Sequence, residues 1–385
     1  MKTKHFLSAL LLSVITVAGS FGQTAYNCEG CPEIADRPVV DLSTKADVDG
    51  NLVDQSVVLT CDTLWRLDRK IYVEAGKSLT ILPGTVIKAV ENPTLGTGAA
   101  ALIVTRDGKV YANGSECCPI IFTAEADNLD GTFNKFQQSQ WGGIIVLGKA
   151  HNTVLRGEFN PENPNYQIGE EGSKGLGIIE GVEPSDDRHW YGAAIETSTP
   201  GEVFDNNHSS GSLKYVSIRH GGSRLGTANE INGLTLGSVG KGTTLRNIEV
   251  VSNFDDAIEF FGGTVDLKYA RLLYMGDDNL DWDQGYTGRI QHVVVVQGAT
   301  VPDNPEGTPP SQPGFSGIEA DGDDDDTNLR DWLSDPIVAN LTMIGNKDSG
   351  DDRCLRLKEN TKGEIYNSIF VNFRDGINLA SDGDG

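Results

Sequence analysis

One six-residue pattern, apolar at its first, fourth and sixth positions, recurs through the second half of the chain and constrains the fold more than any other feature. Successive copies start 32, 22, 23, 48 and 27 residues apart. The shortest intervals set the basic period, and the longer ones carry insertions. The copies are LKYVSI from Leu213, LRNIEV from Leu245, LKYARL from Leu267, IQHVVV from Ile290, VANLTM from Val338 and a weaker IYNSIF from Ile365.

A second short apolar run follows each copy after a turn rich in Gly, Asn and Asp, as in DAIEF and DNLDW. Its alternation puts Ile258 and Phe260 on one face of a strand and Glu259 on the other. Short strands that repeat at a near-constant period, with no helical stretch between them, predict an all-β chain coiled into a parallel β-helix. A β-sandwich also has many short strands, but it would not repeat one apolar phase and one turn position.

The amino-terminal part continues this pattern in SLTILPGTVIKA, ALIVTRDGKVYANG and WGGIIVLGKA. At these segments, and at GSLKYVSIRHGG and DDAIEFFGGTVDLKYARL, the chain resembles secreted, pectate-lyase-like β-helix proteins of Gram-negative bacteria. The likeness runs from about Trp65 to the end of the chain. It implies a right-handed, single-stranded parallel β-helix that is secreted or held on the outer cell surface. The group has no agreed activity, so the likeness carries over no catalytic residues.

The amino terminus predicts a secretory signal peptide over residues 1–22, with two lysines before an apolar run from Phe6 to Val17. We expect a cysteine-containing segment and cap over 23–64 and a β-helix over 65–385, with insertions at about 152–210 and 299–336. Proteins of the group often end in a sorting domain for type IX secretion. This chain ends in SDGDG instead, so we expect either a fragment or another mode of surface retention.

The formal net charge of −24 excludes several classes of partner. Such a chain repels phosphate backbones and anionic lipid, so we expect neither nucleic acid nor a membrane surface as partner. After the signal peptide, no segment is apolar enough to insert into a membrane. The charge favours cations or neutral glycans, and the expected partner is an extracellular glycan or a cell-surface component.

The six cysteines follow the predicted signal peptide. Export permits disulfides, and neither CEGC nor ECCP has the second ligand pair that a zinc site would need. No βαβ pattern surrounds CEGC, which argues against redox catalysis. We therefore expect structural disulfides near the amino end, with their pairing left open.

The stretch MGDDNLDWDQGYTG concentrates carboxylates beside apolar strand residues. Glu259 and Asp281 each lie 14 residues after the start of an apolar run, so they should stack in successive coils. Neighbouring strands are about 4.8 Å apart, and at that distance two like charges repel by roughly 1 kcal/mol in water and about 3 to 4 at an effective dielectric near 20. The full column is Thr235, Glu259, Asp281, Glu319, Arg356 and Asn378.

Solvation, Arg356 or a bound cation could relieve this repulsion. Calcium takes six to eight oxygen ligands at about 2.3 to 2.6 Å, which predicts a Ca²⁺ site. A solvated acidic face is the alternative interpretation. The expected ligands are Glu259, Asp281, Asp283, Glu319 and Asp321.

Two further columns follow from the same period. Lys214, Arg246 and Lys268 form a basic column that either balances charge or binds acidic sugar. Asn247, Asn340 and Asn367, with His292 between them, predict an amide ladder at a turn.

Pectate-lyase-like folds include enzymes that use calcium and a basic residue on acidic polysaccharide. Arg356 lies two or more coils from Glu259 and Asp281, too far to act on one sugar ring with them, and His220 in IRHGG has no nucleophile beside it. We therefore expect a noncatalytic module for adhesion or glycan binding. A calcium-dependent polysaccharide lyase or glycoside hydrolase is the alternative.

The first insertion contains one aromatic cluster. His189, Trp190 and Tyr191 predict either a platform for a sugar ring or the small core of the insertion itself. Together with Arg356, they are the candidate ligand-binding residues.

Overall fold

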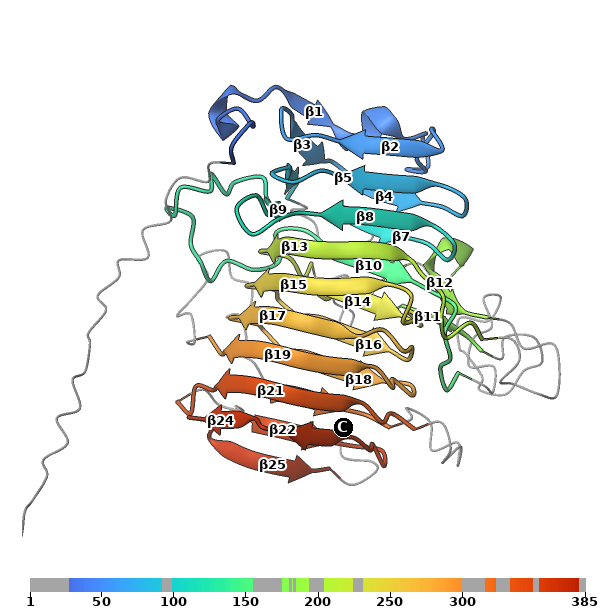
Figure 1. Cartoon of the computed structure of the whole chain (residues 1–385). Coiled ribbons are helices and arrows are strands. Elements are labelled where there is room, and N and C mark those ends of the chain that lie inside the picture. The colour runs from blue at the N-terminus through green and yellow to red at the C-terminus, as the bar shows by residue number, and fades with distance from the viewer. Residues whose placement is uncertain are drawn as a thin grey trace, which may run out of the picture.

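The computed structural model is a stack of coils, which Figure 1 shows from the amino-terminal end (blue) to the carboxy-terminal end (red). The expected signal peptide, the residues from Asp323 to Asp326 and the final SDGDG lie outside the residues that the structure describes. The described residues are 28–91, 99–154, 175–179, 182, 185–193, 204–223, 231–298, 316–322, 333–348 and 353–380.

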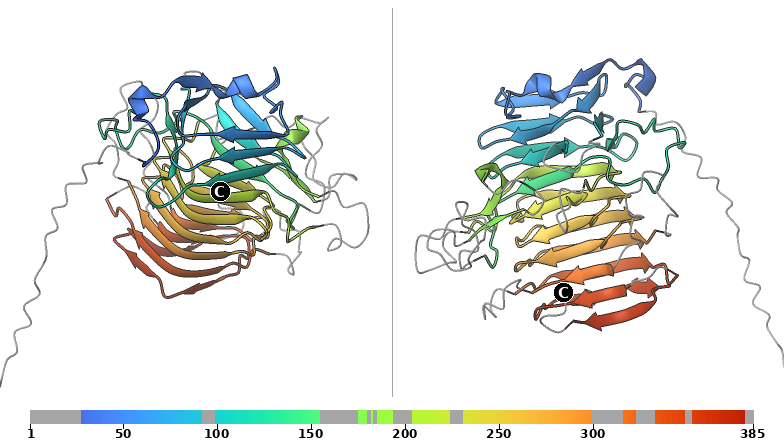
Figure 2. Two further views of the ribbon diagram at one scale, coloured as in Figure 1. Left: turned by 45° about the horizontal axis from the view of Figure 1, so that its top comes forward. Right: turned by 180° about the vertical axis from the view of Figure 1, so that it is seen from behind.

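Two parallel sheets form the walls of the stack (Figures 1 and 2). Sheet one has 14 strands: β1 (Val39–Asp41), β2 (Ser56–Leu59), β3 (Leu64–Leu67), β5 (Ser78–Ile81), β6 (Val86–Ala89), β8 (Lys109–Asn113), β9 (Ile120–Ala124), β13 (Gly211–Arg219), β15 (Thr244–Val251), β17 (Leu267–Leu273), β19 (Arg289–Val296), β21 (Ile337–Ile344), β23 (Glu364–Tyr366) and β24 (Ile369–Val371). Sheet two has nine: β4 (Lys70–Val73), β7 (Ala101–Val104), β10 (Gly143–Leu147), β14 (Leu234–Gly237), β16 (Ile258–Phe261), β18 (Leu280–Asp283), β20 (Ser316–Ala320), β22 (Arg353–Leu357) and β25 (Asp375–Leu379).

The remaining elements are few. β11 (Leu176–Ile178) and β12 (Trp190–Gly192) form a two-stranded antiparallel sheet in the first insertion. Three short 3-10 helices are η1 (Ile34–Asp36), η2 (Leu42–Lys45) and η3 (Asp187–His189). The described residues contain no α-helix, and none of their helices could span a membrane. The architecture confirms the expected right-handed parallel β-helix. Strands of the stack already occur before Trp65, because β1 pairs with β3 and β2 with β5.

The strand register confirms the repeat that the sequence predicts. The first apolar residues of the six copies are consecutive partners in sheet one, despite the unequal chain lengths between them. The inward residues of both sheets form one continuous core. Within it, Phe260 and Tyr286 are fully buried and their rings stack at 4.3 Å. Burial of such side chains contributes roughly 25 cal/mol for each Å² removed from water.

Each long strand of sheet one bends at the same position. The bend residues have φ values between 45° and 62°. In each strand, the residues on either side of the bend pair with the neighbouring strand, and the bend residue itself does not. The predicted amide ladder is present where Asn367 donates to Asn340 Oδ1 at 2.5 Å. It does not extend to Asn247, whose column neighbours are tyrosines. The bend residues are Tyr215, Asn247, Tyr269, His292, Asn340 and Asn367.

Two disulfides join the amino-terminal coils, as expected. Cys28 pairs with Cys118 and Cys31 with Cys61. Gly84 has a φ of 79° and lies against both bridges, where an added Cβ would stand 2.8 Å from the Sγ atoms of Cys28 and Cys31. A side chain at this position would therefore strain the backbone and displace the bridges.

Candidate metal centre

A column of outward-facing residues runs the length of sheet two and changes character halfway. Its first part is apolar, and its second part is the acidic column that the sequence predicts. The register confirms every step of that prediction, including Glu319 after the second insertion. In order, the column is Tyr72, Ile103, Ile145, Thr235, Glu259, Asp281, Glu319, Arg356 and Asn378.

The first insertion covers the apolar part of the column. Tyr191 is fully buried, packs against Ile103 and Ile145 in one apolar cluster, and its ring lies 6.0 Å from that of Phe261. His189 is also buried, and its Nε2 lies 3.0 Å from Tyr72 Oη.

The burial of His189 and Tyr191 leaves neither ring face open to a sugar. The burial does not fit a sugar platform at these two residues. It also differs from a core of the insertion alone, because both side chains pack against residues of sheet two. Trp190 is half-buried and lies on β12 beside Tyr191, whereas His189 ends η3.

Tyr191→Phe is expected to lower the free energy of unfolding by about 1 kcal/mol, because its hydroxyl donates to Gln284 Oε1 at 2.5 Å across to the turn after β18. Chemical denaturation measures the change. The exposed Tyr111 provides the control, since Tyr111→Phe should leave stability unchanged.

The acidic part of the column meets a second row of carboxylates from the turns that precede each strand. Two groups of three ligand oxygens that lie within 4.8 Å of one another combine the two rows: Asp256, Glu259 and Asp281 in one, Asp278, Asp281 and Glu319 in the other. Asp281 belongs to both groups, so they form one continuous cluster across three coils. We call these five residues the acidic cluster. A third group, of Asp255, Asp256 and Asp277, lies in the turns alone.

The turns hold the acidic cluster by their own hydrogen bonds. Asp256 Oδ1 accepts from the backbone N–H of Asp278 in the next coil at 2.8 Å. Asn232 Oδ1 accepts from the N–H of Asp256 at 3.1 Å, and Asn232 Nδ2 donates to Glu259 Oε2. These bonds hold the Asp256 and Glu259 carboxylates in place.

Burial makes the charge in this cluster costly. It raises the pKa of Asp256, Asp278 and Asp281 well above the ordinary aspartate value, and neighbouring carboxylates raise it further. Asp278 is 2% exposed, and its Oδ1, like the buried Oδ1 of Asp281, has no hydrogen-bond partner among the described residues. An oxygen left without a donor in a buried site is satisfied by a proton, by an ordered water molecule or by a cation.

Two basic residues neutralise the carboxy-terminal end of the column. Arg356 Nη1 lies 2.9 Å from Glu319 Oε2, and Lys358 Nζ lies 2.5 Å from Glu319 Oε1 and 2.9 Å from Asp321 Oδ2. Burial opposes the positive charge of Lys358, but these carboxylates outweigh it and raise its pKa. Burial also opposes the charge of Glu319, but the Asp278 carboxyl and Lys358 outweigh it and lower its pKa. Arg356 was one of the three possible sources of relief that the sequence offered, and Lys358 was not foreseen.

The five predicted ligands therefore divide into two sets. Glu259, Asp281 and Glu319 belong to the acidic cluster. Asp283 aligns with Phe261 and accepts from the N–H of Gln284, while Asp321 pairs with Lys358, and neither joins a three-carboxylate group among the described residues. Asp256 and Asp278 take their places. The signal for them was in the sequence, because each lies three residues before a column acid and the two are 22 residues apart, one period of the repeat.

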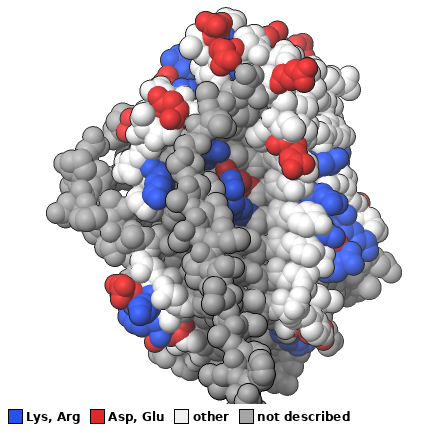
Figure 3. All heavy atoms as spheres, turned by 60° about the vertical axis from the view of Figure 1, so that its left-hand side comes forward, with Lys and Arg blue, Asp and Glu red and all other residues white. Residues whose placement is uncertain are grey.

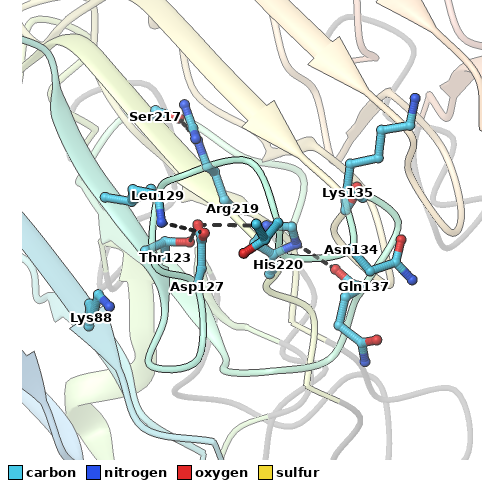
Figure 4. Close-up of polar contacts among 12 residues, drawn as sticks. Lys88, Thr123, Asp127, Leu129, Asn134, Lys135, Gln137, Ser217, Arg219 and His220 are labelled. Carbon is cyan, nitrogen blue, oxygen red and sulfur yellow. Dashed lines mark hydrogen bonds and ion pairs between the residues drawn. The ribbon is translucent and has the colours of Figure 1, made fainter. Parts of the chain in front are cut away.

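His220 lies in a separate polar cluster under the loop before β10 (Figure 4). Its Nδ1 lies 2.7 Å from the Gln137 carbonyl oxygen, and its Nε2 lies 4.0 Å from Asp127 Oδ2. Asp127 accepts from Thr123 Oγ1 at 2.7 Å and from the N–H of Leu129 at 2.9 Å. His220 is buried at a φ of 64° directly after β13, and its contacts anchor this loop.

The donor atoms of the acidic cluster decide which ion it could hold. Its donors are all carboxylate oxygens, which suit Ca²⁺ or Mg²⁺ rather than softer metals. The neighbouring carboxylates raise the pKa of Lys358 and of Arg356 and so keep both side chains charged. Both are therefore poor proton acceptors.

A family model described as a pectate-lyase like beta helix domain matches residues 50–168 and 195–385 of this chain. A search of curated proteins and a search of solved structures each gave no significant match.

Proposed function

Because the chain belongs to the pectate-lyase-like β-helix domain family, we propose that it is a noncatalytic, secreted or cell-surface module that binds extracellular glycan and is stabilised by bound Ca²⁺. The observation that carries the cation is the pair of unpartnered oxygens on Asp278 and Asp281 inside the acidic cluster. Each of the two groups brings three carboxylate oxygens within 4.8 Å of one another, and water would supply the remaining ligands of a calcium shell at either group.

Secretion is supported by the two disulfides, which persist in oxidising compartments. The absence of catalysis is supported by the state of Lys358 and Arg356. A lyase needs a neutral base near the sugar, and both groups are held charged by Glu319. The glycan is the partner that an acidic exported β-helix with long loops can accommodate without charge repulsion.

One observation favours the alternative, a calcium-dependent lyase or glycoside hydrolase. Glu259 and Asp281 are register partners on adjacent strands, a separation of about 4.8 Å that approaches the 5 to 5.5 Å of retaining glycosidases. The raised pKa of Asp281 would also suit a general acid. An enzyme would lose turnover on Asp281→Asn while it stays folded.

Relative to the protein in chelator, calcium at 100 times its dissociation constant is expected to raise the free energy of unfolding by about 2.7 kcal/mol. Asp281→Asn should abolish that gain, because Asp281 belongs to both groups of the acidic cluster. Thermal unfolding in calcium and in chelator measures it. Asp266→Asn, an exposed acid paired with Arg289 outside the cluster, should keep the full response. An equal melting temperature with and without calcium would remove the cation from the proposal.

A further inference from the structure

A cavity of about 460 Å³ lies where the first insertion meets the turns that follow three neighbouring strands of sheet two. The turns come after β4, β7 and β10, and η3 of the insertion supplies the rest of the described lining. The volume is typical of a small-molecule site. No residue of the acidic cluster lines it, so it is a separate candidate site. Its charged lining residues are Glu74, Arg106, Asp107, Lys149, Asp187 and Arg188.

Four of these charged residues are already paired within the fold, and two are not. Each of the four has a group of opposite charge within ion-pairing distance. Within the described part of the chain, neither Arg106 nor Asp187 has such a partner. The cavity therefore offers one cation and one carboxylate to a ligand. The existing pairs are Glu74 with Lys77, Asp107 with Lys149 and Arg188 with Asp186.

Arg106 is the less solvated of these two groups. Burial lowers its pKa, although the charges of Asp187 and Asp107 act in the opposite direction. Among the described residues, its side chain makes a single hydrogen bond, from Nη1 to the Gly192 carbonyl oxygen at a long 3.4 Å. A guanidinium has five N–H donors, so most of them are left for a ligand. A bound anion would replace the water that this cation has lost.

Cations on the open surface differ from Arg106 in this respect. The predicted basic column is present on sheet one, where Lys214, Arg246 and Lys268 are register partners in successive coils. Arg246 is exposed, and Lys and Arg side chains gather along the right-hand margin of the face in Figure 3. A solvated cation needs no ligand to compensate its charge. Arg106 is half-buried in a concave site, which singles it out.

Asp187 faces the same cavity from the insertion. Its charge is close enough to attract Arg106, yet the two residues do not form an ion pair. Asp187 lies in η3 and Arg106 in the turn after β7, so the two charges stand on opposite parts of the lining. This separation leaves room between them for a ligand that carries both a carboxylate and an ammonium group.

The balance of charge also selects this class of ligand. The charged lining residues are three cations and three acids, so they sum to zero in a chain of net charge −24. An anion would gain at Arg106, but the chain as a whole repels it. A zwitterion has no net charge and avoids that repulsion, and its ammonium gains a second contact at Asp187.

We propose that this cavity binds a small zwitterion of the α-amino acid class, with its carboxylate on the Arg106 guanidinium and its ammonium on Asp187. The planar guanidinium can hold a carboxylate through two parallel N–H···O bonds. The inference goes beyond the proposed function, because it uses neither the acidic cluster nor a glycan.

The test is a thermal-shift screen of the full chain with each of the common amino acids, followed by calorimetric titration of the one that stabilises most. The amine that lacks its carboxylate and the acid that lacks its ammonium are titrated beside it. We expect each analogue to bind at least about tenfold more weakly. Arg106→Gln should weaken amino acid binding by about tenfold or more, and Asp187→Asn severalfold.

Matched controls are Arg246→Gln and Asp36→Asn, exposed residues outside the cavity, which should bind as the unchanged chain does. Melting temperatures verify that every variant is folded. Should Arg106→Gln fail to fold, the exposed Asp187→Asn decides the outcome. Binding that survives both cavity changes would overturn the site, and so would equal binding of either analogue. A screen in which no amino acid stabilises the chain would overturn it as well, and would leave the calcium and glycan proposals untouched.

Discussion

In chelator at pH 8, the Asp278→Asn protein is expected to melt at a higher temperature than the unchanged protein. Asp278 is almost fully buried, and its pKa is raised by that burial and then by Asp277, Glu319 and Asp281. A carboxyl with a raised pKa contributes stability below its unfolded value, about 4, and that stability is lost as the pH rises through the folded pKa. A tenfold change in proton affinity on folding corresponds to about 1.4 kcal/mol, and asparagine mimics the neutral acid at every pH.

The same linkage fixes how the calcium response depends on pH. Protons compete with the cation for Asp256, Asp278 and Asp281, so the calcium-induced rise in melting temperature should grow from pH 5 to pH 8. Glu319 has a lowered pKa, so its titration falls below about pH 4.3. Its charge therefore does not change between pH 5 and pH 8. His151, His208 and His220 have pKa values lowered by burial. Their effect on the melting temperature is the same in calcium and in chelator, so it cancels when the two temperatures are subtracted.

Thermal scans at several pH values, in calcium and in chelator, measure both effects, with Asp266→Asn as the exposed control. A calcium response that stays constant with pH would contradict a site made of these carboxyls. A lower melting temperature for Asp278→Asn in chelator would show that the carboxylate is already compensated without a cation.

Phe260→Ala is expected to lower the free energy of unfolding by about 3 to 5 kcal/mol. Phe260 is fully buried in β16 and stacks on Tyr286, so truncation removes the contact of two large rings and leaves a cavity between coils. Collapse of the cavity is restricted because the strands above and below are fixed by their own register.

Urea denaturation measures this loss. Val294→Ala, on an exposed position of β19, is the control and should change stability by less than about 0.5 kcal/mol. A loss below about 1 kcal/mol for Phe260→Ala would mean that the coils can repack around the cavity, contrary to the fixed register.

The sequence predicted the fold and the columns because both depend on one period. Once Leu245 and Leu267 are partners, Glu259 and Asp281 must be partners too, since each lies 14 residues further on. The sequence interpretation of the acidic cluster was incomplete at Asp256 and Asp278. They lie in turns, where no strand alternation tells which way a side chain points.

Tertiary packing accounts for the other differences. Tyr191 becomes buried because the insertion that carries it folds back over Ile103 and Ile145, residues far away in the sequence. Lys358 lies just past β22, and only the coil stacking brings its Nζ to Glu319 and Asp321. Neither contact follows from local spacing.

The stacking of the coils does not depend on the length of the chain that joins them. Leu280 and Ile318 are 38 positions apart and Ile258 and Leu280 are 22 apart, yet both pairs align one to one in sheet two. Loop closure adds only about 0.6 kcal/mol for each doubling of length. A foreign peptide grafted between Gln297 and Ser316 should therefore be displayed without disturbing the scaffold, which makes this β-helix a candidate frame for engineered recognition loops.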